Sequence, residues 1–135
     1  MTDTTETRTG RVGDAMSADV LTVGPGHTLR QVAEALARRK VGAAVVHDTD
    51  GSGVGIITER DILRSVAAGE SPDEQTAADH QTTEVVFATP SWTLFEAAEA
   101  MRRGGFRHLV VLDGGEVAGI ISVRDIVNAW MPAHV

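Results

Sequence analysis

Apolar and polar positions follow one clear pattern in the first half of this chain. An extended apolar stretch, Val20–Val23, is followed by a Pro-containing turn, and apolar residues then recur at helical spacing from Leu29. Two short β-branched stretches come next, Ala43–Val46 and Val54–Ile57, separated by a turn rich in Asp and Gly. Helical spacing predicts an amphipathic helix, and short β-branched runs predict strands. With a second helix expected to start near Asp61, the predicted order is β-α-β-β-α.

The second half of the chain repeats this pattern. A shift of 65 residues carries Thr28-Leu29 onto Thr93-Leu94, and after one residue is lost in a turn, a shift of 64 carries Arg60-Asp61 onto Arg124-Asp125. Matches that keep their order in this way indicate an internal duplication. The predicted elements of the second copy are the strands Val85–Ala88, Leu109–Leu112 and Val117–Ile121, and helices starting at Thr93 and near Asp125. The first helix of each copy starts with a capping-box pattern, Thr28 with Gln31 and Thr93 with Glu96.

Each copy is roughly fifty to sixty residues long, which is too short to bury a sheet face and two helices by itself. We therefore expect the two copies to pack about a pseudo-twofold axis and to form one α/β (α+β) module. The expected boundaries are a disordered polar tail at 1–10, the first repeat at 11–69, a polar linker at 70–76, the second repeat at 77–131 and a tail at 132–135.

Composition excludes several classes of partner and chemistry. The 135 residues carry a formal net charge of −7 and contain no cysteine, which excludes disulfides and thiolate chemistry. Nucleic-acid phosphates need a basic face, and the one Lys/Arg run, Arg38-Arg39-Lys40, lies at the end of a predicted helix, where cations complement exposed carbonyl groups. Neither a secretory signal nor an apolar run of ~18 residues occurs. We therefore expect a cytoplasmic protein without a membrane segment or a nucleic-acid partner.

No catalytic or metal-binding motif is found in the sequence. The five histidines are scattered without H-x-x-x-H or H-E-x-x-H spacing, and there is no P-loop, G-x-G-x-x-G or G-x-S-x-G string. We therefore expect no enzyme activity, no metal site and no required cofactor. The two tryptophans, Trp92 and Trp130, are candidates for a dimer contact, because large aromatic residues anchor interfaces. The alternative is that each fills a gap in the core.

Two strings at matching places in the duplication resemble the CBS (cystathionine-β-synthase-type) family, whose paired motifs are also called the Bateman module. They are G-I-I-T-E-R-D-I (Gly55–Ile62) and G-I-I-S-V-R-D-I (Gly119–Ile126), supported by Val12–Val23 and Phe106–Leu112. The resemblance implies a stand-alone two-motif protein of the bacterial type. It also implies clefts between the motifs that bind AMP, ADP, ATP, S-adenosylmethionine or a dinucleotide, together with a homodimer and a regulatory role.

The resemblance places the ribose of such a ligand at the T-x-x-D element, where a strand ends and a helix begins. The residues are Thr58 with Asp61 in the first copy and Ser122 with Asp125 in the second. A carboxylate can accept hydrogen bonds from both ribose hydroxyls, and a helix N-terminus offers free amides to a phosphate. The same residues are an ordinary helix-capping pattern, and the two roles are compatible.

In this family, a basic residue near the start of the second strand often meets the phosphate. The second copy has Arg107 and His108 there, whereas the first has Gly42 and Ala43. We therefore expect the second cleft to bind a charged nucleotide, and the first to bind weakly, to take a neutral adenosine group or to stay empty. Further candidates are Arg60 and Arg124 for phosphate, and Val20, Leu21, Ile56, Val85, Val86 and Ile120 as walls of an adenine slot. Their alternatives are solvated surface cations and core strand residues.

These observations favour a non-catalytic sensor that binds an adenosine-containing ligand. The alternative is a structural or protein-interaction homodimer that binds no nucleotide, and Gly42 favours this alternative for one half of the chain. The sequence indicates no particular protein target.

Overall fold

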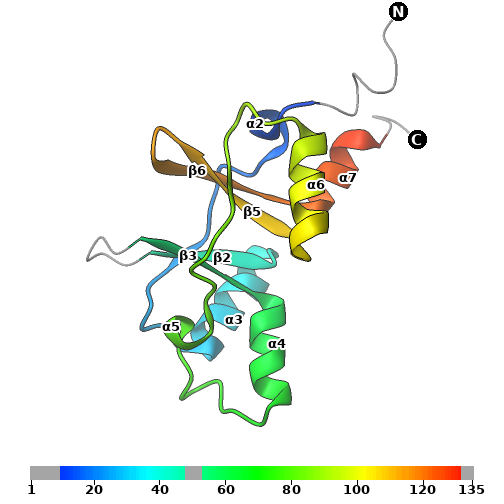
Figure 1. The fold of residues 1–135 in the computed structure, drawn as a ribbon. Helices are drawn as coiled ribbons and strands as arrows, with labels where there is room; N and C mark the ends of the chain where they lie inside the picture. Colours follow the sequence, from blue (N-terminus) through cyan, green and yellow to red (C-terminus); the bar gives the residue numbers. More distant parts are fainter. Residues whose placement is uncertain (1–9, 48–52, 132–135) are drawn as a thin grey trace, which may run out of the picture. The chain divides into compact units, whose positions relative to one another are not determined.

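The structure is a computed structural model that describes residues 10–47 and 53–131. The chain divides into two compact units, one of residues 20–85 and one of residues 1–19 together with 86–135. We call these the central unit and the terminal unit. Each has its own sheet, its own helices and its own hydrophobic core (Figure 1).

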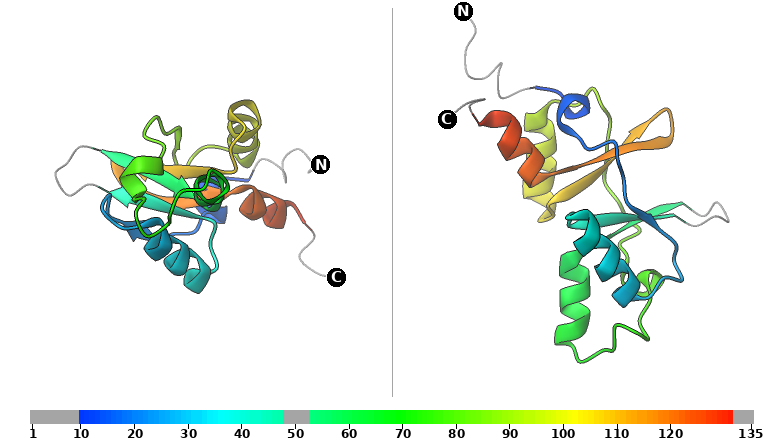
Figure 2. Two further views of the ribbon diagram at one scale, coloured as in Figure 1. Left: turned by 90° about the horizontal axis from the view of Figure 1, so that it is seen from below. Right: turned by 180° about the vertical axis from the view of Figure 1, so that it is seen from behind.

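The central unit is built on a three-stranded sheet in the order β1-β2-β3, in which β1 runs parallel and β3 antiparallel to β2. Its elements are β1 (Thr22–Val23), α3 (Leu29–Arg39), β2 (Ala43–His47), β3 (Val54–Thr58), α4 (Glu59–Ala67) and α5 (Ala77–His80). Helix α3 packs against β2, and α4 packs against β3 and α3 (Figures 1 and 2).

The terminal unit repeats this arrangement with the order β4-β5-β6 and the same strand directions. Its elements are α2 (Val12–Ala15), β4 (Phe87–Ala88), α6 (Leu94–Gly104), β5 (His108–Asp113), β6 (Glu116–Ser122) and α7 (Val123–Trp130). Helix α6 packs against β5, and α7 packs against β6, α6 and α2.

The apolar stripes of α3 and α6 each supply three buried residues to the core of their unit. Leu29, Val32 and Leu36 of α3 are buried against strand residues such as Val46 and Ile57. In the terminal unit, the buried helical residues are Leu94, Ala97 and Met101, and the buried strand residues include Leu109, Val111 and Ile121. Since alternate residues of a strand point to opposite faces, one face of each sheet meets the helices.

The predicted order β-α-β-β-α is confirmed in both copies, as is the α/β fold of two tandem motifs. The capping boxes expected at Thr28 and Thr93 are present. The tight turn of the second hairpin is also present, with Gly114 and Gly115 at φ of 62° and 86°, values that favour glycine. The corresponding turn of the first copy lies largely at 48–52, outside the described residues.

The second helix of each copy starts near Asp61 and Asp125, as expected, at the residue that follows the capping Thr or Ser. Two other details of the prediction are wrong. The first strand of each copy is shorter than expected, Thr22–Val23 and Phe87–Ala88. The short helices α2 and α5 were not predicted at all.

The segment that leads each repeat packs against the other repeat. Residues 10–19 lead the first repeat but belong to the terminal unit, where Ser17 and Ile120 exchange two backbone hydrogen bonds of 2.9 and 3.0 Å. Residues 77–85 lead the second repeat but belong to the central unit, where Thr82 and Ile56 exchange bonds of 2.8 and 3.0 Å. Sequence repeats and compact units are therefore different divisions of this chain.

Candidate functional site

The junction of β6 and α7 is organised by Asp125. The backbone amide and hydroxyl of Ser122 donate to the Oδ2 atom of Asp125 over 2.8 and 2.9 Å, and the amide of Asp125 donates to the Ser122 hydroxyl over 3.1 Å. In the central unit, Thr58 and Asp61 make the same three bonds, of 2.8, 3.0 and 3.3 Å. The capping role of both T-x-x-D elements is thus confirmed.

Capping uses only one oxygen of each carboxylate. Oδ1 of Asp125 and Oδ1 of Asp61 receive no hydrogen bond from the described residues, and both aspartates are half-buried. A carboxylate oxygen accepts hydrogen bonds through two lone pairs. Each junction therefore retains an oriented acceptor that the fold itself does not need.

The residues predicted to meet a phosphate lie beside this junction in the terminal unit. The carbonyl of Arg107 accepts a bond of 3.0 Å from the amide of Val123, and His108 lies opposite Ser122 in the β5-β6 register. Arg107 and Arg124 are exposed. The structure therefore brings Arg107, His108, Ser122, Arg124 and Asp125 together at the start of one helix.

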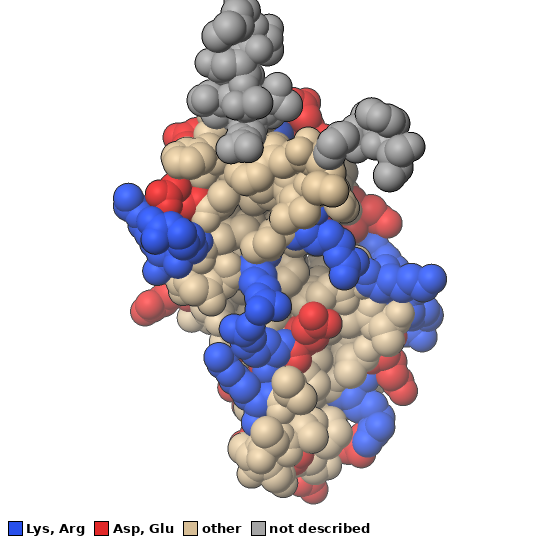
Figure 3. All heavy atoms as spheres, turned by 90° about the vertical axis from the view of Figure 1, so that its right-hand side faces the viewer, with Lys and Arg blue, Asp and Glu red and all other residues tan. Residues whose placement is uncertain are grey.

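The same place in the central unit lacks this pair of basic residues. The carbonyl of Gly42 accepts a bond of 3.0 Å from the amide of Glu59, and Ala43 lies opposite Thr58. Arg60 is exposed in the first turn of α4. The two junctions thus share one backbone geometry and differ in the charge that surrounds it. On the face drawn in Figure 3, Lys and Arg side chains are interspersed with acidic ones.

The predicted adenine walls occupy several environments. Ile120 is half-buried and pairs with Ser17, whereas Ile56 is buried and pairs with Thr82. Leu21 packs against the core of the central unit, which agrees with the alternative that it is a core residue. Val20 and Val85 are half-buried in the central unit, and Val86, in the terminal unit, is exposed. Because of the segment exchange, Ile120 lies next to the chain that precedes Val20, and Ile56 next to the chain that precedes Val85.

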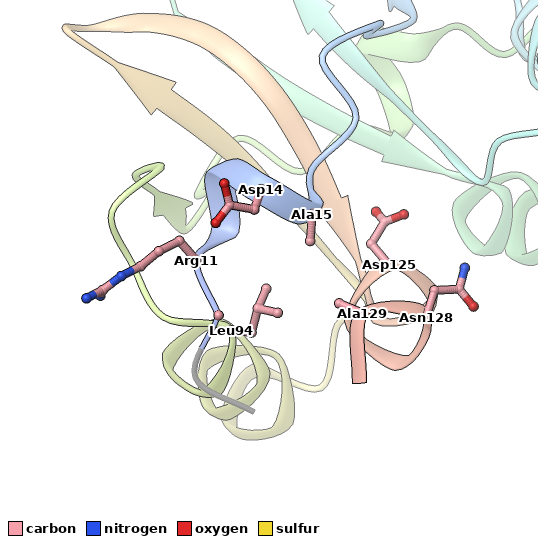
Figure 4. A pocket seen from close by; sticks show the side chains of 8 residues that line it. Arg11, Asp14, Ala15, Leu94, Asp125, Asn128 and Ala129 are labelled. Atoms are coloured by element: carbon pink, nitrogen blue, oxygen red, sulfur yellow. The ribbon is translucent and has the colours of Figure 1, made fainter. Parts of the chain in front are cut away.

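A pocket of about 440 Å³ adjoins Asp125 in the terminal unit (Figure 4). It lies between α2, the start of α6 and one face of α7, and this volume is typical of small-molecule sites. Its lining residues are Gly10, Arg11, Asp14, Ala15, Leu94, Asp125, Asn128 and Ala129. Only Asp125 was a predicted site residue. Asn128 and Ala129 lie three and four residues after Asp125, so helical spacing could have identified them as lining residues. The lining residues on α2 could not be identified, because α2 itself was not predicted.

The rim of this pocket carries more negative than positive charge. The carboxylate of Asp14 has no hydrogen bond from the described residues and is exposed. Arg11 points away from the pocket (Figure 4). Its guanidinium donates to the carbonyl of Ser91 over 3.0 Å. Close by, hydrogen bonds from the amide and hydroxyl of Thr93 lower the pKa of Glu96, with a smaller contribution from the charge of Arg11.

Both tryptophans lie in the terminal unit and pack against its core, which agrees with the alternative that each fills a gap there. The indole Nε1 of Trp130 is buried without a hydrogen-bond partner among the described residues. Residues 10–47 and 53–131 contain no cluster of three or more His, Asp or Glu side chains that could hold a metal ion. No helix in this part of the chain is long and apolar enough to cross a membrane.

The fold and the duplicated junction define a tandem α/β repeat with one candidate ligand-binding junction in each compact unit. The chain belongs to the CBS domain family, whose family model matches residues 12–68 and 77–131.

Solved structures and curated relatives agree with this assignment. The crystal structure of the CBS-domain containing protein ATU1752 from Agrobacterium tumefaciens is 38% identical, covers 90% of this chain and 93% of that chain, and has a TM-score of 0.82. The CBS domain protein PAE2072 from Pyrobaculum aerophilum, complexed with AMP, is 32% identical, with coverage of 85% and 88% and a TM-score of 0.77. The CBS domain-containing protein YhcV of Bacillus subtilis is 33% identical over 85% of this chain and 81% of its own length.

Other relatives are longer than the matched region. The chain spans 63% of a Methanopyrus kandleri protein and 41% of a Methanocaldococcus jannaschii protein.

Proposed function

We propose that this protein is a non-catalytic regulatory module that binds an adenosine-containing ligand, with the ribose on Asp125. The observation that carries the proposal is the unused Oδ1 oxygen of Asp125 at the edge of the 440 Å³ pocket. It is supported by the relative of 32% identity that is complexed with AMP. The ligand acts as a signal, and no cofactor is required.

The chemistry of the junction fits a nucleoside monophosphate or a larger adenosine derivative. The two neighbouring ribose hydroxyls donate to the Asp125 carboxylate, which Ser122 holds in place. Arg107, Arg124 and His108 lie beside this junction, and their positive charge or N–H groups suit a phosphate, as do the free amides at the start of α7. Ile120, with the chain leading to Val20, supplies apolar surface for the base.

The terminal unit is proposed as the stronger site. Asp61 and Thr58 reproduce the ribose acceptor in the central unit, but Gly42 and Ala43 replace the two basic residues. The central junction therefore lacks this basic pair but keeps Arg60 and the backbone amides at the start of α4. A ligand that binds one arrangement of the module better than another would shift the population between them, which a partner protein could then sense.

The test is thermal unfolding with AMP, ADP, ATP, S-adenosylmethionine and NAD. A ligand at 100 times its Kd stabilises the folded state by about 2.7 kcal/mol, which raises the Tm by several degrees. We expect one ligand to do this, and Asp125→Asn to abolish the shift because it removes the carboxylate but keeps an acceptor for the cap.

Two matched variants are the controls. Asp61→Asn changes the central junction, and Asp79→Asn changes a capping box that is not part of the proposed site; both should retain the shift. If none of the five ligands raises the Tm, the proposal is refuted, and a protein-interaction module without a nucleotide becomes the better description.

A second proposal is that two copies associate through the helical faces. Leu63 and Val66 on α4 are 67% and 50% exposed, and Val123 and Val127 on α7 are 40% and 48% exposed. Leu63 and Val127 are equivalent under the repeat shift, so the chain presents two related apolar surfaces. Self-complementary apolar patches are typical of twofold dimers.

This proposal is tested by the mass of the protein in solution, measured by light scattering. Leu63→Glu and Val127→Glu should each convert a dimer to a monomer, whereas Val41→Glu, at an exposed apolar residue outside both helices, should not. A wild-type protein that is monomeric at all concentrations would rule the dimer out.

A further inference from the structure

The pocket of the terminal unit has a counterpart in the central unit. The backbone bonds that frame the two places match pair by pair, and α5 packs against α4 as α2 packs against α7. The matching bonds are Leu94 N to Gly10 O (2.6 Å) with Leu29 N to Gln75 O (2.9 Å), and Val12 N to Trp92 O (2.8 Å) with Ala77 N to His27 O (2.8 Å). The two places can therefore be compared residue by residue.

Three small residues line the terminal pocket, and all three become larger and polar in the central unit. Gly10, Ala15 and Ala129 line the pocket. Their equivalents under the repeat shifts are Gln75, His80 and Ser65 respectively. Leu94 and both aspartates, in contrast, keep their type as Leu29, Asp79 and Asp61.

Two of the larger residues, Gln75 and His80, meet each other, and Glu70 of the linker meets both His80 and Ser65. Nε2 of His80 lies 2.8 Å from Oε1 of Gln75 and 3.3 Å from Oε1 of Glu70. The hydroxyl of Ser65, a residue that is 2% exposed, donates to the same Glu70 oxygen over 2.7 Å. The place that is a pocket in the terminal unit thus holds the Glu70 carboxylate in the central unit.

We propose that Glu70 is a tethered internal ligand that closes the central unit's counterpart of the pocket, so that the chain binds one adenosine ligand, in the terminal unit. The statement about stoichiometry depends on the function proposed above. The occupation of the site by Glu70 does not depend on it. The residue equivalent to Glu70 after α7 is His134, which lies outside the described residues and carries an imidazole in place of a carboxylate.

Two physical effects keep the central site closed against a free ligand. Displacing Glu70 would leave the buried Ser65 hydroxyl without its partner, and an unsatisfied buried polar group is costly. In addition, Glu70 lies five residues from Ser65 in the chain. A tether this short gives an effective concentration of about millimolar or more, against which a free ligand has to compete.

The first experiment measures stoichiometry by calorimetric titration with adenosine, which needs no phosphate contact. The variant Ser65→Ala/Glu70→Ala/Gln75→Gly/His80→Ala introduces the three small residues of the terminal pocket and removes the Glu70 carboxylate, and we call it the copied lining. We expect the wild type to bind about one adenosine per chain and this variant to bind about two. Asp125→Asn alone should bind no adenosine, and the copied lining combined with Asp125→Asn should bind about one adenosine per chain. A stoichiometry that stays unchanged in the copied lining would overturn the inference.

The second experiment tests Glu70 without any nucleoside. Glu70→Ala should lower the Tm, and acetate should restore part of the loss, relative to chloride at equal ionic strength, because it can occupy the carboxylate position between Ser65 and His80. Glu74→Ala is the matched control, since Glu74 is an exposed linker residue whose side chain has no bond to the described residues. Equal responses of both variants to acetate would contradict the internal-ligand role even if adenosine binds. Acetate rescue without adenosine binding would instead refute only the proposed function.

Discussion

Four acidic side chains at helix starts each accept hydrogen bonds from a Thr or Ser three residues earlier. They are Asp61, Asp79, Glu96 and Asp125. Such a bond satisfies an amide that the helix leaves without a partner. At Asp61 and Asp125, one oxygen accepts these bonds, and the other, which receives none from the described residues, is the acceptor proposed for a ligand. The two functions of the carboxylate can therefore be separated by mutation of its partner.

Removing the hydroxyl of Ser122 tests this separation. Ser122→Ala takes away one bond to the Asp125 side chain and the acceptor of the Asp125 amide. We expect the free energy of unfolding, measured with urea, to fall by about 0.5–2 kcal/mol. Binding of the ligand should weaken much less than in Asp125→Asn. If Ser122→Ala abolishes binding while the stability is unchanged, the hydroxyl is a ligand contact and not a cap.

The capping carboxylates also predict how stability depends on pH. The amide and hydroxyl of Thr76 lower the pKa of Asp79 from its ordinary value of 3.8. A carboxylate with a lowered pKa in the folded state adds stability above its unfolded pKa, and this stability is lost as the pH falls through the folded pKa. The ordinary pKa of an Asp carboxyl lies near 4, so the loss begins at about that pH. We expect the Tm of Asp79→Asn to fall less than the Tm of the wild type as the pH is lowered below about 4. Glu74→Gln is the control, and an equally reduced fall in its Tm would contradict the assignment.

At the scale of elements, one strand glycine in each unit admits the leading segment of the other repeat. A Cβ added at Gly119 would lie 2.7 Å from the Ser17 carbonyl and 2.7 Å from the Met16 sulfur. At Gly55, the corresponding Cβ would meet the flexible side chain of Gln81 and lie 3.1 Å from the Thr82 carbonyl. These glycines allow the exchanged segments to lie directly on β6 and β3.

We expect Gly119→Ala to destabilise the protein more than Gly55→Ala. The first variant forces a backbone carbonyl to move, whereas a side-chain end can rotate away in the second. Overpacking of this kind costs about 1–3 kcal/mol. Urea unfolding of both variants provides the comparison. Equal losses in the free energy of unfolding would indicate that the backbone at the Ser17–Ile120 pairing moves as easily as the end of a side chain.

Elements with strong local signals could be predicted from the sequence, and those that depend on distant backbone contacts could not. The apolar stripes and the Thr caps of α3 and α6 are local, so their positions were predicted. Helix α5 has a Thr76-x-x-Asp79 cap that could have revealed it, but α2 begins after Arg11, which caps nothing with its side chain. Since α2 forms one side of the pocket, the pocket was not predictable, although Asp125 at its edge was. The pairings of Ser17 and Thr82 are between backbone groups and leave no side-chain pattern.

At the scale of the whole molecule, the compact units predict which fragments fold. The fragment 20–85 contains the complete central unit, including Ala77, which is fully buried in its core. A fragment cut at the sequence repeat, 11–69, lacks Ala77 and the Thr82 pairing. We expect 20–85 to show a cooperative thermal transition by circular dichroism and 11–69 to show none. Domains of this size are only marginally stable, so the absence of α5 from 11–69 should be enough to prevent it from folding. A stable 11–69 fragment would contradict this division.

The exchange of leading segments also dictates an order of events during synthesis of the chain. The Ser17 segment emerges from the ribosome early, but its partner Ile120 is made about a hundred residues later. The central unit, by contrast, is complete once Thr82 has emerged and can fold as the rest is translated. For that interval the first segment has no partner on its own chain. The Ile120 strand of a neighbouring nascent chain offers the same backbone groups, so we expect crowded translation of one message to raise the share of intertwined pairs of molecules.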